Sequence, residues 1–160
     1  MTGKRLDSPG RMAQKGASAP PAGVARFTAF DIVGMTTANP SLDGLRILLA
    51  EDEGLIALEL ETVLQGFGCE VVGPVGRVND VLREAERGGL DGALLDVNLR
   101  GEQIFAILPR LIELKLKIVI TSGYDDASLY PEAFRTLPRL AKPFDERALR
   151  RICERTFLAT

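Results

Sequence analysis

The sequence contains no histidine and no tryptophan, and it has only two cysteines. Without histidine, the chain cannot build a Ser-His-Asp or Cys-His catalytic site from its own residues, or a metal site that depends on imidazole. It also cannot itself carry a phosphohistidine. Cys69 and Cys153 lie far apart in apolar-patterned segments and form no CxxC pair. We therefore expect buried free thiols rather than a zinc or redox site.

Long apolar runs and a strong excess of one charge are missing as well. No run of about 18 apolar residues is present, so nothing in the sequence predicts a membrane span. The net charge of −2 is not that of a nucleic-acid-binding domain. We therefore expect neither a membrane nor a nucleic acid as partner, and a cytoplasmic location. A hydrophobic share of 46% over 160 residues is ordinary for a soluble globular domain.

Residues 1–44 differ in composition from the rest of the chain. They are slightly basic and rich in Gly, Pro and Ala, whereas residues 45–160 are acidic. We expect residues 1–44 to be a mostly disordered extension and residues 45–160 to form the domain. The extension does not resemble a secretory signal, because polar residues rather than an apolar core follow Lys4. Two alternatives remain open: residues 25–33 dock on the domain as a short strand or helix, or translation starts at Met35.

From Leu45 onward, apolar runs typical of strands alternate with segments of helical periodicity. The expected strands are 45–50, 69–74, 92–96, 117–122 and 139–141. The expected helices are 56–67, 79–87 with Asn79 as cap, 102–114 with Pro109 inside it, and a last one capped by Asp145. This alternation predicts an α/β fold with a doubly wound, five-stranded parallel sheet. A flavodoxin-like strand order 2-1-3-4-5 would bring strands one, three, four and five together.

Polar residues follow four of these strands at their carboxyl ends, where ligands bind in such sheets. They are Glu51-Asp52-Glu53, Asp96, Ser122-Gly123 and Lys142-Pro143. Each group alone is typical of an ordinary loop. Their order, each after a separate strand, predicts that they converge on one site.

A cluster of carboxylates beside one amine is suited to binding a divalent cation and a phosphoryl group. The carboxylates repel one another unless a cation joins them, and Mg²⁺ favours carboxylates, waters and a phosphate. Lys142 would bind a phosphoryl oxygen, Ser122 would donate a hydrogen bond, and the Gly123 amide would be open to approach. An aspartate in this cluster can act as a nucleophile and form an aspartyl phosphate.

At these residues the sequence resembles a bacterial response-regulator receiver domain. The resemblance covers residues 45–160 and rests on the segments LRILLAEDE, GALLDVNLRGE, IVITSGY and LAKPFD, which occur in the family's order. The resemblance implies two-component signalling, with phosphotransfer from a histidine kinase or a histidine phosphotransfer protein. The chain would be a stand-alone receiver, because no output module follows the domain in this sequence.

The resemblance also implies roles for single residues. Asp96 would be the phosphoacceptor. Mg²⁺ would be held by Asp52, Asp96 and the backbone carbonyl of Asn98, with Glu51 assisting through a water. Ser122 would be the switch hydroxyl, with Gly123 beside it, and Lys142 would pair with the phosphoryl group. The bond before Pro143 would be cis.

Three departures from the family pattern concern the switch and the phosphoryl lifetime. Arg139 stands where the family often has an aromatic residue. Pro131 and Pro138 leave little room between the fourth and fifth strands, so we expect a shortened or irregular fourth helix. Gly123-Tyr124 is similar to the FAT GUY subgroup of receivers. Tyr124 and Asn98 would tune dephosphorylation, with Tyr124 slowing it by screening the phosphoryl group; alternatively, Tyr124 only packs on the domain.

The route by which a signal leaves the domain stays open at this stage. Six arginines in the 135–155 region could dock an acidic protein partner, or they could simply be solvated: Arg135, Arg139, Arg147, Arg150, Arg151 and Arg155. A receiver-like scaffold that takes no phosphate is a second hypothesis. A phosphatase with Asp96 as nucleophile is a third, which Asn98 weakens because such enzymes usually have an acid at that position.

Overall fold

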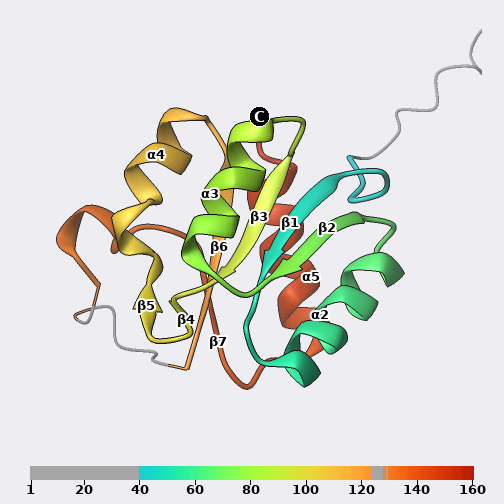
Figure 1. The fold of residues 1–160 in the computed structure, drawn as a ribbon. Helices are drawn as coiled ribbons and strands as arrows, with labels where there is room; N and C mark the ends of the chain where they lie inside the picture. Colours follow the sequence, from blue (N-terminus) through green and yellow to red (C-terminus); the bar gives the residue numbers. More distant parts are fainter. Residues whose placement is uncertain (1–39, 124–127, 129) are drawn as a thin grey trace, which may run out of the picture. The chain divides into compact units, whose positions relative to one another are not determined.

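The computed structural model describes residues 40–123, 128 and 130–160 (Figure 1). Five parallel strands form its sheet, in the order β2-β1-β3-β6-β7. The strands are β1 (Arg46–Ala50), β2 (Glu70–Val75), β3 (Gly92–Asp96), β6 (Lys117–Ser122) and β7 (Arg139–Ala141). This topology confirms the predicted doubly wound α/β fold and its 2-1-3-4-5 order.

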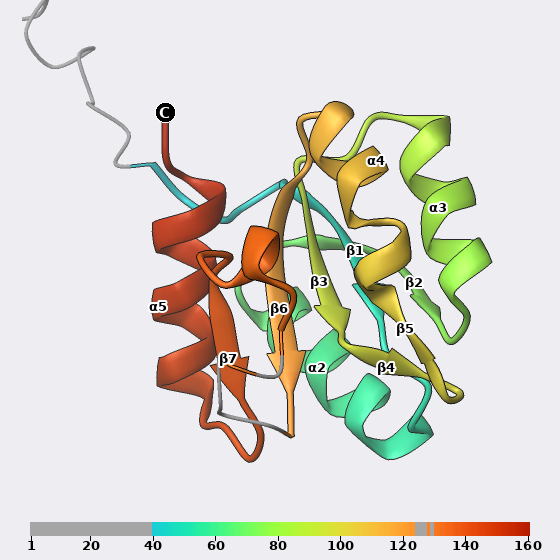
Figure 2. The same ribbon diagram turned by 90° about the vertical axis from the view of Figure 1, so that its left-hand side faces the viewer.

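Helices cover both faces of the sheet (Figure 2). Helices α2 (Gly54–Gly66) and α5 (Glu146–Phe157) cover one face, and α3 (Val78–Arg87) and α4 (Leu108–Glu113) cover the other. The central strands therefore have no solvent-exposed face, and every residue of β3 is buried. Leu95 packs into the core beneath α3 and α4, whereas its neighbour Leu94 packs beneath α2 and α5. This two-sided burial explains why the strands are continuous apolar runs.

The segment after β3 differs from the single helix expected over residues 102–114. It begins with a two-stranded antiparallel hairpin, β4 (Asn98–Leu99) and β5 (Glu102–Gln103). A 3₁₀ turn, η1 (Ile104–Ala106), follows, and α4 starts only at Leu108. Pro109 lies in the first turn of α4 rather than inside a helix. No kink results, because the first turn of a helix does not use the amide that proline lacks.

Two expected helix caps have different outcomes. Asn79 lies inside α3 rather than before it, since α3 begins at Val78 after an extended Arg77. Asp145 does cap α5, and its Oδ1 accepts a hydrogen bond of 2.7 Å from the Ala148 amide. A polar residue caps a helix only where it stands directly before the first helical residue, as Asp145 does and Asn79 does not.

Between β6 and β7, the described residues contain no α-helix, in agreement with the expected shortened or irregular fourth helix. A short 3₁₀ turn, η3 (Glu132–Phe134), lies there instead. The Phe105 ring contacts the edge of the Tyr130 ring and stacks on Phe134. The Arg139 guanidinium lies over Tyr130, 4.9 Å from the ring centre. An arginine–aromatic stack thus occupies the region where the family often places an aromatic residue on β7.

The core reaches slightly further towards the N-terminus than Leu45, the expected start of the domain. Leu42 is only 2% exposed and belongs to the core beneath α2 and α5. Its carbonyl accepts a hydrogen bond from the Cys69 thiol at 3.6 Å. Both cysteines are buried free thiols, as expected. Within the described part of the chain, no helix is long and apolar enough to cross a membrane.

Candidate functional site

The expected site residues meet at the carboxyl edge of the sheet. Asp96 is the last residue of β3 and Ser122 is the last of β6, while Glu51 and Lys142 directly follow β1 and β7. A cavity of about 460 Å³ opens there, lined by Asp52, Glu53, Asp96, Val97, Asn98, Ser122, Gly123 and Lys142. Parallel strands end at a common edge, and residues up to 91 positions apart are thereby brought into contact.

Lys142 joins two of the carboxylates. Its Nζ donates hydrogen bonds to Glu51 Oε2 at 2.7 Å and to Asp96 Oδ2 at 2.9 Å. Glu51 is 3% exposed and Asp96 is 8% exposed, so both contacts are shielded from water. Burial alone would lower the pKa of the Lys142 ammonium, but the two carboxylates outweigh it and raise that pKa above its ordinary value. Lys142 is therefore a fixed positive charge within the site.

The carboxylates of Glu51, Asp52 and Asp96 form the one compact acidic group that the described residues offer for a metal ion. One oxygen of each lies within 4.8 Å of the others. Hard oxygen donors of this kind suit Mg²⁺ or Ca²⁺, and a single lysine leaves an excess of negative charge for a cation to neutralise. The donor set therefore fits a divalent metal.

Backbone amides fix the three carboxylates further. The Glu53 amide donates to Glu51 Oε1 at 3.0 Å, and the Asn98 amide donates to Asp96 Oδ1 at 3.3 Å. The Arg100 amide donates to Asp52 Oδ2 at 2.9 Å. Sequence reasoning missed this last contact, because it placed a helix from Glu102 onward and no hairpin before it. Gly101 was the available signal, since glycine is favoured at the second position of two-residue hairpin loops.

Ser122, Gly123 and Pro143 lie where the sequence places them. Ser122 is 2% exposed, and its carbonyl accepts a hydrogen bond of 2.8 Å from the Lys142 amide. Gly123 is exposed at the mouth of the cavity, and the Lys142–Pro143 bond is cis. Tyr124, expected to tune dephosphorylation, lies outside the described residues.

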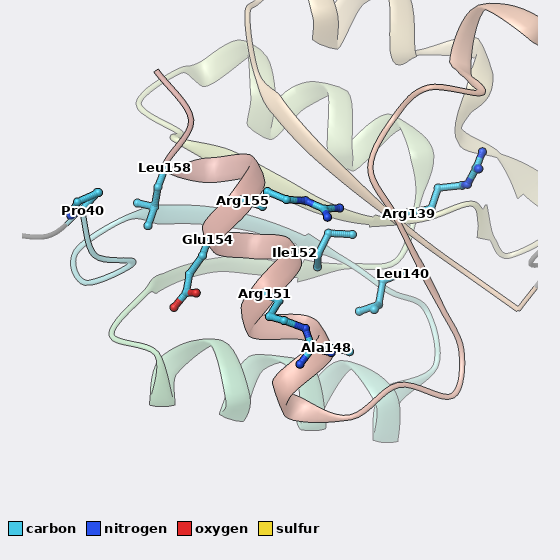
Figure 3. A pocket seen from close by; sticks show the side chains of 9 residues that line it. All are labelled: Pro40, Arg139, Leu140, Ala148, Arg151, Ile152, Glu154, Arg155 and Leu158. Atoms are coloured by element: carbon cyan, nitrogen blue, oxygen red, sulfur yellow. The ribbon is translucent and has the colours of Figure 1, made fainter.

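The six arginines of residues 135–155 do not share one environment. Arg135 and Arg139 donate to the backbone carbonyls of Tyr130 and Arg135, at 3.1 and 3.0 Å. Arg150 lies over the Phe67 ring, 4.1 Å from its centre. Arg151 and Arg155 extend from α5 beside a groove of about 820 Å³, which Arg139 also lines (Figure 3). The groove is lined by Pro40, Arg139, Leu140, Ala148, Arg151, Ile152, Glu154, Arg155 and Leu158.

Several known proteins are similar to the chain in sequence or structure. No family model matches the chain. The solution structure of SdrG from Sphingomonas melonis Fr1 is 33% identical, covers 74% of this chain and 99% of its own, and superimposes with a TM-score of 0.63. The receiver domain of the sensor histidine kinase PA1611 from Pseudomonas aeruginosa PAO1, which holds a magnesium ion in its active-site cleft, is 25% identical. It covers 72% of this chain and 99% of its own, with a TM-score of 0.62.

The curated relatives are longer proteins. The sensory transduction protein LytT of Bacillus anthracis is 31% identical over 105 residues, which are 64% of this chain. The matches span 24% to 57% of the length of the curated relatives that are compared with the chain.

Proposed function

Because the chain belongs to the response-regulator receiver family, we propose that it accepts a phosphoryl group on Asp96 in a Mg²⁺-dependent reaction. The donor is a phosphohistidine on a histidine kinase or a histidine phosphotransfer protein, since this chain has no histidine of its own. In this role the chain is a signalling protein rather than an enzyme with a turnover substrate. A cytoplasmic location agrees with its two free thiols.

One observation carries the proposal: the Lys142 ammonium bridges Asp96 and Glu51 while Asp52 lies beside them. Asp52, Asp96 and the carbonyl of Asn98 would hold Mg²⁺, with Glu51 acting through a water. When bound, Mg²⁺ neutralises charge that develops on the phosphoryl oxygens. Lys142 and a bound Mg²⁺ would together place positive charge around the acceptor oxygen, and phosphoryl transfer demands little more than such positioning.

The transfer itself exchanges one bond to phosphorus for another. An Asp96 carboxylate oxygen forms the new bond, and the bond between phosphorus and the donor imidazole nitrogen breaks. The imidazole leaves with its electron pair and takes a proton from solvent. Lys142 then moves its hydrogen bonds to a phosphoryl oxygen, and the Ser122 hydroxyl and Gly123 amide donate to the others.

A labelling experiment tests the proposal. The protein is incubated with acetyl phosphate and Mg²⁺, and bound phosphate is measured by intact mass. We expect stoichiometric labelling of the wild type, no labelling of Asp96→Asn, and unchanged labelling of Asp80→Asn, a matched change in a partly exposed ion pair on α3, away from the site.

The other outcomes identify the competing functions. No label on the wild type would favour a scaffold that works by constitutive contact. Continuous turnover of acetyl phosphate would favour a phosphatase. The surroundings of Asn98 make turnover the weaker candidate, because its side-chain oxygen is engaged by the Gly101 amide at 2.8 Å and no acid stands there.

Two finer roles belong to the same proposal. A downstream acidic protein would dock at the arginine-rich 135–155 region, where Arg139, Arg151 and Arg155 line the groove beside α5. Charge reversal at Arg151 and Arg155 should then abolish partner binding, and intact binding would contradict the docking role. Tyr124 and Asn98 would set the phosphoryl lifetime, because they stand at the two positions that guide the attacking water in the family. An unchanged decay of the acyl phosphate in Tyr124→Ala would contradict that role for Tyr124.

A further inference from the structure

We infer that the turn at Arg100-Gly101 is a positioning element that holds the Asp52 carboxylate ready for a divalent cation. The inference rests on the proposed function, because it concerns the same metal site. It assigns the role to the backbone amide of Arg100 and to the conformation of the turn, not to the guanidinium.

Asp52 is held differently from the other two carboxylates. Lys142 bonds to Glu51 and Asp96, whereas the Asp52 carboxylate receives a hydrogen bond of 2.9 Å from the Arg100 amide. These two residues are 48 positions apart in the sequence. A carboxylate on a half-exposed loop would otherwise sample several rotamers, and a cation would have to order it on binding. The Arg100 amide removes part of that cost in advance.

The turn has the geometry that this contact requires. Arg100 and Gly101 have φ values of 54° and 87°, and the strands on either side pair as Asn98 with Gln103 and Leu99 with Glu102. A two-residue hairpin loop with positive φ at both positions is typical of a type I′ turn. Asparagine is the favoured residue at the first of these positions, so Arg100 occupies it at some conformational cost.

The same hairpin also touches Asp96. Asn98 Oδ1 accepts from the Gly101 amide at 2.8 Å, which closes the turn, while the Asn98 amide donates to Asp96 Oδ1 at 3.3 Å. Leu99 is 1% exposed and anchors the hairpin in the core. One small, anchored loop therefore spans the two aspartates that would share the cation.

The guanidinium of Arg100 offers a competing explanation that the test must separate. A Cβ added at Gly76 would lie 3.6 Å from Arg100 Nε and 3.5 Å from the Asp52 Cα, so the side chain runs back over this edge of the site. If its charge mattered, any uncharged residue at position 100 would change the affinity for a cation equally.

The variants Arg100→Asn and Arg100→Val distinguish the role of the turn conformation from that of the guanidinium charge, because both remove the guanidinium and both keep the backbone amide. Asparagine tolerates positive φ, whereas a β-branched residue does not. In Arg100→Val the turn opens in the metal-free protein and must re-form when the cation binds. We expect the Mg²⁺ dissociation constant, measured by calorimetry, to rise about five- to tenfold in Arg100→Val. We expect it to stay within about twofold of the wild type in Arg100→Asn.

Lys115 supplies the matched control. It is the other described non-glycine residue with positive φ, at 58°, and it is exposed beyond the end of α4. Lys115→Val should lower the melting temperature as Arg100→Val does, but leave Mg²⁺ affinity unchanged. Hydrogen exchange of the Arg100 amide in the metal-free protein gives a second readout: slow in the wild type and Arg100→Asn, fast in Arg100→Val.

Equal Mg²⁺ affinity for Arg100→Asn and Arg100→Val would overturn the inference, whether both match the wild type or both are weaker. Rapid exchange of the Arg100 amide in the metal-free wild type would overturn it too. Failure of the proposed function would look different, because acetyl phosphate would then leave no label on wild-type Asp96.

Discussion

The Lys142 ammonium lies 2.9 Å from Asp96 Oδ2 and 2.7 Å from Glu51 Oε2, although the lysine follows β7 and the acids belong to β3 and the end of β1. One cation thus compensates two carboxylates that are almost completely buried. A buried pair of this kind contributes little net stability when complete but is costly when one member is removed.

Lys142→Met should therefore destabilise the fold by about 2–3 kcal/mol in the absence of divalent cations, because Glu51 and Asp96 lose their counter-charge. Mg²⁺ should restore part of this loss by taking over the compensation. Urea denaturation with and without Mg²⁺ measures both effects. Lys115→Met, at an exposed lysine, is the control and should change the unfolding free energy by less than about 0.5 kcal/mol. A Lys142→Met protein as stable as the wild type would contradict this account.

Gly92 opens β3 directly beneath α5. A Cβ at this position would meet the Phe157 ring at 2.5 Å, so Gly92→Ala should push the C-terminal end of α5 outward. We expect a loss of about 1–3 kcal/mol in the unfolding free energy. Gly66→Ala, where no atom lies within 4 Å of the added Cβ, should by contrast be neutral or slightly stabilising. Thermal unfolding of the two variants side by side measures the difference.

Lys117 fastens the C-terminal end of α5 to the sheet. Its Nζ donates to the Phe157 carbonyl at 2.8 Å and to the Ala159 carbonyl at 2.6 Å. These contacts satisfy carbonyls at a helix end and place a positive charge at the negative end of its dipole. Lys117→Met should cost about 1–2 kcal/mol. Faster hydrogen exchange in the last turn of α5 should accompany this loss, and unchanged exchange there would argue against the fastening.

Cys153 predicts how stability depends on alkaline pH. Burial is the main cause that raises the pKa of the Cys153 thiol from 9.0 to about 12, and the nearby Cys69 and Glu154 raise it by smaller amounts. The folded protein keeps this proton while the unfolded chain releases it. The stabilisation is therefore complete below pH 9 and is lost as the pH rises from 9 towards 12.

Denaturation at pH 8 and pH 10.5 tests this dependence. The unfolding free energy of the wild type should fall between the two, and it should fall less in Cys153→Ala. At pH 8 the native thiol should react far more slowly with iodoacetamide than the thiol of the unfolded chain. Equal reaction rates would contradict the burial of a neutral thiol.

Much of this architecture is visible in the sequence because its signals are local. The strands 92–96, 117–122 and 139–141 have the expected bounds, since buried parallel strands are short apolar runs between polar turns. The rule that such strands present ligands at their carboxyl ends then places Asp96 and Lys142 near each other. No knowledge of contacts is needed for that step.

The errors lie where local signals conflict. Residues 102–114 contain apolar residues at helical spacing, yet the segment starts with Glu102 and Gln103, which pair with Leu99 and Asn98 as a hairpin. That pairing depends on the burial of Leu99 in the core. The spacing of apolar residues within 102–114 does not reveal this contact. Charge in the sequence also does not report individual contacts, such as those that Arg139 makes with the Tyr130 ring and Arg150 with the Phe67 ring.

The sequence by itself determined the fold class and which acids, hydroxyl and lysine stand at the strand ends, because apolar periodicity and strand ends are properties of short segments. The strand order was expected from the fold class, and the pairing of the strands confirms it. Only the tertiary structure decided that Lys142 joins Glu51 to Asp96 and that the Arg100 amide holds Asp52. Those contacts connect residues 46 or more positions apart. Their geometry follows from the packing of the strands and the hairpin against one core, which no local pattern records.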